Sequence, residues 1–185
     1  MRQAILEHRF GVGGLHWCCG PGTFEDVIDI DAISFYPHII VNWHLTPDWI
    51  KEDGYKKLIE QRILGNKDPQ LKMALNTVTG KLRMTNASVE DKDRGLTMCL
   101  LGQILITILK EKLVDAGAKI IQINTDGIMI QAQDSKYFDA TREWIDFANI
   151  PLKIKDIDKL EQADVNNYRA TFCDGTIKTK GVKFK

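Results

Sequence analysis

The chain has 185 residues, of which 44% are hydrophobic, so it can bury a core and favours one domain or one domain with a small insertion. Its 25 basic and 25 acidic side chains cancel, which excludes a global attraction to nucleic acid and leaves only local charged patches. The four cysteines show no C-x-x-C spacing, which argues against zinc and favours a reduced, intracellular setting. The N-terminus shows no apolar signal region, and the most apolar run, 96–109, is shorter than the about 20 residues of a membrane span.

The first predicted strand follows a glycine-rich segment. Gly11–His16 lacks both a helix start and the Lys-Ser/Thr pair of a phosphate-binding loop, so we interpret it as a loop or bulge. Residues 27–33 alternate with the period of a strand, with two isoleucines on one face and Asp29 and Asp31 on the other. The strand ends in the turn Ser34–Pro37, which exposes backbone N–H groups beside a carboxylate. That arrangement suits a metal-bound anionic substrate better than a core.

Two helices joined by a turn at 65–69 are predicted over residues 47–83, where basic side chains outnumber acidic ones. The second helix carries Lys72, Asn76 and Gly80 at i, i+4 and i+8, on one face. A solvated charged face is one interpretation of the basic excess; the other is a lysine that meets a triphosphate. Gly80 costs the helix about 1 kcal/mol relative to alanine, which indicates the close approach of a flat group such as a base pair.

The rest of the chain alternates helices and strands. Residues 84–95 are polar and predict a short strand and loop, and residues 96–116 predict a long helix that Gly117 ends. Residues 119–132 predict a strand hairpin with Asp126 in its tight turn. Three further elements complete the chain: a helix at 135–149 with Ser135 as N-cap, a strand at 152–157 and a hairpin at 168–180.

This order of elements predicts an α+β fold, namely a ferredoxin-like antiparallel sheet with helices on one face and a two-helix insertion. In such a sheet the strands carrying Asp31 and Asp126 can be neighbours. Two carboxylates about 4 Å apart repel by roughly 4 kcal/mol at an effective dielectric near 20, so the pair must share a proton, shift its pKa or hold a cation. Oxygen ligands without a nearby Cys/His cluster favour Mg²⁺ or Mn²⁺.

Three motifs in a fixed order carry a family resemblance. Asp31–Ile40, DAISFYPHII, resembles the first palm motif of family B DNA polymerases, D-x-x-S-L-Y-P-S-I-I. Lys72–Gly80 resembles K-x-x-x-N-x-x-Y-G, and Asn124–Gly127 resembles D-T-D-S. Upstream, Gly13–His16 is similar to the G-G-x-H of viral members. The chain therefore resembles the palm and fingers of a viral or phage family B DNA polymerase over about residues 13–181.

The resemblance implies a palm formed by residues 1–46 and 84–185 and a fingers hairpin formed by residues 47–83, without exonuclease or thumb domains. The implied activity is template-directed transfer of dNMP from dNTP to a primer 3′-hydroxyl, with two Mg²⁺ or Mn²⁺ ions as cofactors. The implied partners are primer–template DNA, dNTP and the missing polymerase domains, on the same or on other chains, and no membrane. The expected location is the cytoplasm, that of the host cell for a viral protein.

The resemblance also implies roles for individual residues. Asp31 and Asp126 correspond to the catalytic, metal-binding aspartates, with the carbonyl of Ala32 as a backbone ligand. Tyr36 would lie under the sugar and exclude a 2′-hydroxyl. The other implied nucleotide-binding residues are Ser34, Phe35, Arg62, Lys72, Asn76 and Gly80, and the implied DNA-binding residues are Thr125, Lys178, Lys180 and Gly181.

Four positions depart from the family pattern. Asn124 stands where the family has its first aspartate, Gly127 replaces a serine, and Thr79 replaces a tyrosine that stacks near the template base. Asp29 has no counterpart and is either a third carboxylate on the metal face or a structural aspartate. Two alternative functions remain open: another palm-type nucleotidyltransferase, such as a reverse transcriptase or RNA polymerase, and a non-catalytic, degenerate palm that acts as a nucleic-acid-binding or assembly module.

Overall fold

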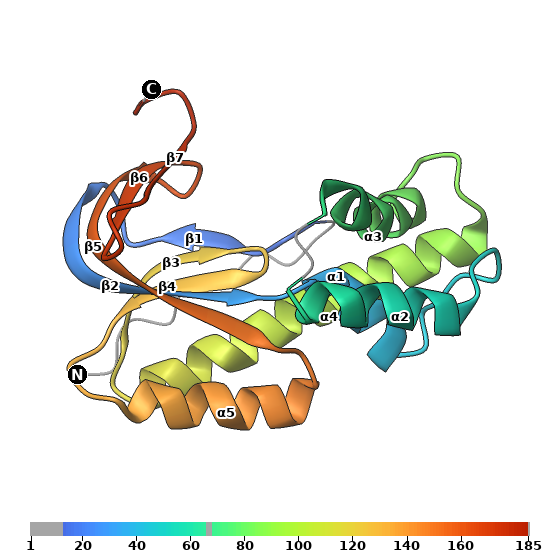
Figure 1. Ribbon diagram of the computed structural model, residues 1–185, viewed down its shortest axis with the longest axis horizontal. Coiled ribbons are helices and arrows are strands. Elements are labelled where there is room, and N and C mark those ends of the chain that lie inside the picture. Colours follow the sequence, from blue (N-terminus) through green and yellow to red (C-terminus); the bar gives the residue numbers. More distant parts are fainter. Residues whose placement is uncertain (1–12, 66–67, 185) are drawn as a thin grey trace.

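A curled antiparallel sheet organises the computed structural model, which describes residues 13–65 and 68–184 (Figure 1). In sheet order, its seven strands are β1 (His16–Cys18), β3 (Lys119–Asn124), β4 (Gly127–Gln131), β2 (Gly22–Ala32), β5 (Leu152–Asp164), β6 (Asn167–Phe172) and β7 (Ile177–Lys180). The order β3-β4-β2-β5 at the centre, with helices between β2 and β3 and between β4 and β5, is the ferredoxin-like arrangement. The predicted α+β class is therefore confirmed.

The helices fall into two groups (Figure 1). α4 (Val89–Asp115) and α5 (Lys136–Ala148) lie side by side against one face of the sheet, where the indole Nε1 of Trp144 donates a 2.8 Å hydrogen bond to the carbonyl of Leu105. α1 (Phe35–Asn42), α2 (Glu52–Ile63) and α3 (Pro69–Leu82) gather around the N-terminal half of α4. The predicted two-helix insertion is thus present as α2 and α3.

The two faces of the sheet differ in chemistry. The main core fills the space between the sheet and the helices and includes Ile30, which is fully buried on β2. The opposite face carries a smaller apolar cluster together with Asp29 and Asp31, because side chains alternate along the strand. Asp26, whose φ is 53°, is left out of a pairing of β2 with β5 that otherwise keeps one register. The curl of the sheet places β7 beside the acidic face of β2, where Lys178 lines one small cavity with Asp29 and Asp31.

Several element boundaries differ from the prediction. The strand expected within 84–95 is wrong, because α4 already begins at Val89, where the Ser88 hydroxyl accepts a 3.1 Å hydrogen bond from the amide of Asp91. Ser135 makes no side-chain cap bond. The expected turn at 65–69 and the start of the glycine-rich segment at 11–16 fall partly on residues outside the described ranges.

The expected end of α4 is confirmed. Gly117 adopts a φ of 85°, and the amide of Ala118 donates a 2.9 Å hydrogen bond back to the carbonyl of Leu113. Across residues 13–65 and 68–184, no helix combines the length and the apolar character that crossing a bilayer requires.

Candidate active site

Asp31 and Asp126 line one cleft of about 890 Å³. The antiparallel register of β2 and β4 places Asp31 opposite Gly127, the residue that follows Asp126. The amide of Ala32 donates a 2.8 Å hydrogen bond to the carbonyl of Asp126, which ties the end of β2 to the turn between β3 and β4. The fold therefore brings together two acidic residues that are far apart in the sequence.

Gly127 makes room for the Asp31 carboxylate. A Cβ at Gly127 would fall within contact distance of Asp31 Oδ1 and lie 3.0 Å from the carbonyl oxygen of Ile30. The resemblance expects a serine at position 127. In the structure, the carboxylate of Asp31 on the neighbouring strand occupies the space that a side chain at this position would need.

The electrostatics of the turn reflect this crowding. Burial of the Asp126 carboxylate, and after it the charge of Asp31, raises the pKa of Asp126 above its ordinary value. Lys178 and Lys180 oppose this shift from β7. A group whose ionised form is disfavoured by a like charge gains stability when a cation approaches.

Asp29 lies on the same face of β2 as Asp31, two residues before it, and is only 4% exposed. Burial, and after it the charge of Asp31, raises the pKa of Asp29 to about 6. Asp29 lines a cavity of about 20 Å³ with Gln122, whose buried Oε1 has no hydrogen-bond partner, and with Lys178. Within the described part of the chain, no three Asp, Glu, His or Cys side chains form a group that could hold a metal ion. Asp29 does not line the cleft that contains Asp31 and Asp126.

The N-terminus of α1 forms the floor of the cleft. Ser34, just before the helix, has a φ of 49°, and its carbonyl accepts 3.0 Å hydrogen bonds from the amide and from Nδ1 of His38. Phe35 and Tyr36 both line the cleft; Phe35 is 3% exposed and belongs to the core, whereas Tyr36 is half-buried. The first turn of α1 contains no acidic residue, so its unpaired backbone N–H groups and positive helix end are available to an anion.

Basic side chains from three elements line the same cleft as the carboxylates. Arg62 near the end of α2, and Lys72 with Asn76 on α3, line the cleft as the resemblance implies. Lys153 on β5 also lines the cleft, and it pairs in register with Asp31. The sequence did not single out Lys153, because the alternation of residues 152–157 predicts a strand but not the strand that it pairs with.

Five implied site residues do not line the cleft. Gly80 lies on the exposed surface of α3, where nothing would lie within 4 Å of an added Cβ, and Gly181 adopts a φ of 80° against the side chain of Asn167. Lys178 and Lys180 lie on β7 with their ammonium groups 5.9 and 6.0 Å from the ring centroid of Tyr168. Although partial desolvation opposes it, the neighbouring Tyr168 and acidic residues raise the pKa of Lys178.

Thr125, the fifth of these residues, connects the turn to the glycine-rich segment. Its Oγ1 lies 3.0 Å from Nε2 of His16, and its amide donates a 2.9 Å hydrogen bond to the carbonyl of Leu15. A Cβ at Gly14 would collide with the Thr125 side chain. The G-G-x-H stretch therefore packs against the turn that carries Asp126 and stabilises it, a role that the sequence alone did not indicate.

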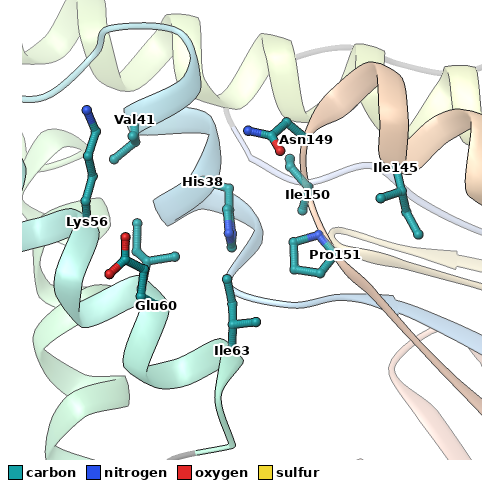
Figure 2. A pocket seen from close by; sticks show the side chains of 10 residues that line it. His38, Val41, Lys56, Glu60, Ile63, Ile145, Asn149, Ile150 and Pro151 are labelled. Carbon is teal, nitrogen blue, oxygen red and sulfur yellow. The ribbon is translucent and has the colours of Figure 1, made fainter.

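A second cavity, of about 350 Å³, lies between α2 and the connection from α5 to β5 (Figure 2). Figure 2 shows His38 between Ile63 on one side and Ile150 and Pro151 on the other. Burial lowers the pKa of His38, so its imidazole is held neutral there. This cavity contains none of the implied site residues, and the acidic and basic groups converge in the larger cleft.

No protein-family model matches the sequence, and no curated protein matches it. Among solved structures, the chain is similar to the family B DNA polymerase from the hyperthermophilic archaeon Pyrobaculum calidifontis, with a TM-score of 0.69 and 16% sequence identity. The fold is that of a polymerase palm-like domain. The similarity covers 98% of this chain and 30% of the archaeal chain, so this chain spans less than a third of that polymerase.

Proposed function

We propose that this chain is the palm and fingers region of a family B DNA polymerase of the viral or phage type, and that its cleft transfers dNMP from dNTP to a primer 3′-hydroxyl. One observation carries the proposal: Asp31 and Asp126 line a single cleft with Tyr36, Arg62 and Lys72. Carboxylates, cations and a helix N-terminus in one cleft are the groups that phosphoryl transfer requires, because this reaction depends on positioning and charge neutralisation.

The donor set of the cleft fits Mg²⁺ or Mn²⁺. Asp31, Asp126 and the carbonyl of Ala32 would hold two such ions, which when bound activate the primer 3′-hydroxyl and neutralise the leaving pyrophosphate. The raised pKa of Asp126, caused by desolvation and by the charge of Asp31, supports this assignment because a bound cation relieves that repulsion.

The remaining cleft residues would bind and orient the nucleotide. Arg62, Lys72 and Lys153 would neutralise the triphosphate, and the first-turn amides of α1 would donate hydrogen bonds to it. Tyr36 would lie under the sugar. Lys178 and Lys180 would contact the DNA backbone on the strand side of the site, so binding should weaken as salt rises.

In this proposal, residues 1–46 and 84–185 form the palm, and residues 47–83, which contain α2 and α3, form the fingers. Basic residues of the hairpin, Arg62 and Lys72, reach the cleft, which supports that division. Primer–template DNA and dNTP are the proposed partners. Further polymerase domains, on the same or on other chains, would supply grip on the duplex.

The test is primer extension and dNTP binding by the wild-type chain, Asp31→Asn and Asp126→Asn. Asp146→Asn, an exposed aspartate on α5, is the matched control. We expect Mg²⁺-dependent dTTP binding and extension in the wild type and the control, and their loss in the two cleft variants. Extension by Asp31→Asn at the wild-type rate, or no Mg²⁺-dependent nucleotide binding by the wild type, would overturn the proposal.

Asn124 favours a second candidate function. This residue supplies an amide where the resemblance expects a carboxylate, and it lines the small cavity beside Asp31. A palm that has lost a ligand could serve as a nucleic-acid-binding or assembly module. DNA binding that is independent of Mg²⁺ and dNTP, without extension, would support this alternative. Equal incorporation of NTP and dNTP would instead indicate an RNA polymerase or a related palm enzyme.

A further inference from the structure

Two glycines on α4 mark places where other elements approach this helix closely. A Cβ at Gly95 would collide with the backbone carbonyl of Leu82, at the end of α3. A Cβ at Gly102 would lie 3.0 Å from Cε1 of Tyr36 and 3.2 Å from Cε1 of Phe35. Glycine inside a helix costs about 1 kcal/mol relative to alanine, so at both positions the helix is less stable but allows close packing.

The neighbours of Gly102 differ in their freedom to move. Phe35 is 3% exposed and Ile39 is fully buried, and a close-packed core resists displacement. Phe35 and Tyr36 both line the 890 Å³ cleft, but Tyr36 is half-buried and therefore has the most freedom of the three to move into it. A side chain at position 102 would therefore press mainly on the Tyr36 ring and displace it towards the cleft.

The Tyr36 ring is also held in a fixed environment. Its centroid lies 5.4 Å from that of Phe35, with an angle of 45° between the ring planes. Burial, and after it Cys99, raises the pKa of Tyr36 to about 12, so the phenol remains neutral. Its contribution to the cleft is thus its shape, which depends on where α4 allows the ring to lie.

We propose that Gly102 is a positioning residue: the absence of a side chain at this point of α4 sets how far the Tyr36 ring reaches into the cleft, and thereby sets the preference for deoxyribonucleotides over ribonucleotides. The inference rests on the proposed nucleotide site. It deepens that proposal, because it assigns control of the sugar preference to a helix that does not itself line the cleft.

The test compares Gly102→Ala with Gly54→Ala, a glycine on α2 around which nothing lies within 4 Å of the added methyl group. Both variants gain helix propensity, but only the first presses on Tyr36. We expect Gly102→Ala to weaken Mg²⁺-dependent dTTP binding about tenfold, because the displaced Tyr36 ring takes space from the sugar. UTP binding should weaken further, because its 2′-hydroxyl needs more of that space. In a Tyr36→Ala background, Gly102→Ala should behave like Gly54→Ala.

A second readout does not depend on activity. The chain contains four tyrosines, so 3-fluorotyrosine labelling gives four ¹⁹F resonances, and Tyr36→Phe identifies the one that belongs to Tyr36. Gly102→Ala should shift this resonance and Gly54→Ala should not. In the wild type, the same resonance should respond to Mg²⁺–dTTP.

The outcomes separate the two proposals. If the wild type binds no nucleotide, the proposed function fails, and with it the sugar preference assigned to Gly102. If the wild type binds dTTP but Gly102→Ala matches Gly54→Ala in its dTTP-to-UTP ratio or in the Tyr36 resonance, only the inference is overturned. If Gly102→Ala unfolds, thermal melting of the double variant with Tyr36→Ala decides: recovery of the fold supports the contact, and continued unfolding refutes it.

Discussion

The close contact between Gly127 and Asp31 predicts that the serine expected from the resemblance would disturb the site if it were placed at position 127. Gly127→Ser adds a Cβ within contact distance of Asp31 Oδ1 and 3.0 Å from the carbonyl oxygen of Ile30. The Ile30 carbonyl belongs to the strand backbone and cannot yield, so the carboxylate must move, by about 1 Å. A displacement of this size costs on the order of 10²-fold in an oriented reaction. We also expect about 1–3 kcal/mol of lost stability from overpacking.

The assay is Mn²⁺ binding by electron paramagnetic resonance, followed by primer extension, with Gly54→Ala as the control because its added methyl group meets nothing. Gly127→Ser should bind Mn²⁺ more weakly than both the wild type and the control, while urea unfolding remains cooperative. If the serine variant bound Mn²⁺ as tightly as the wild type, or extended primers faster, the reasoning from the glycine contact would be refuted.

Three further predictions follow from single contacts. His16→Ala removes the hydrogen bond to Thr125 Oγ1, worth about 1 kcal/mol, and should speed amide exchange at Thr125 and slow extension about fivefold. Because burial raises the pKa of Asp29 to about 6, the stability that its neutral form provides is present below about pH 4 and is lost as pH rises through 6. In EDTA, Asp29→Asn should therefore raise the unfolding free energy at pH 7.5 by up to about 3 kcal/mol and flatten this pH dependence. Trp49→Phe removes the 3.1 Å hydrogen bond from Nε1 to Asp91 and should lower the unfolding free energy by about 1 kcal/mol, measured by urea titration.

Local sequence signals predicted the fold class because strand alternation and turn residues depend on near neighbours in the chain. They missed α1, since Pro37 is typical of a turn although proline is tolerated in the first turn of a helix. They also placed the start of α4 too late. Ser88 followed three residues later by an acidic residue, Asp91, is a helix-start signal that the polar composition of 84–95 concealed.

Site residues that belong to a sequence motif could be predicted from the sequence. Site residues whose place depends on which strands pair could not. The three motifs indicated Asp31, Asp126 and Lys72, which the cleft brings together. Lys153 could not be found in this way, because its place opposite Asp31 depends on the pairing of β2 with β5. A shift of one residue in that pairing would turn every side chain of the strand to the other face.

The carboxylates on this face of β2 and at the β3–β4 turn differ in their access to the cleft. Asp29 faces Lys178, which the curl of the sheet brings from β7, and Lys155, its register partner on β5; both lower its pKa against the effect of burial. Desolvation and the charge of Asp31 raise the pKa of both Asp29 and Asp126, but only Asp126 lines the 890 Å³ cleft, whereas Asp29 is 4% exposed and lines a cavity of about 20 Å³. A divalent ion should therefore bind at Asp126 and not at the buried Asp29, which lies near Lys178 and Lys155. Titrating Mn²⁺ into Asp29→Asn should give nearly wild-type affinity, whereas Asp126→Asn should lose most of the binding.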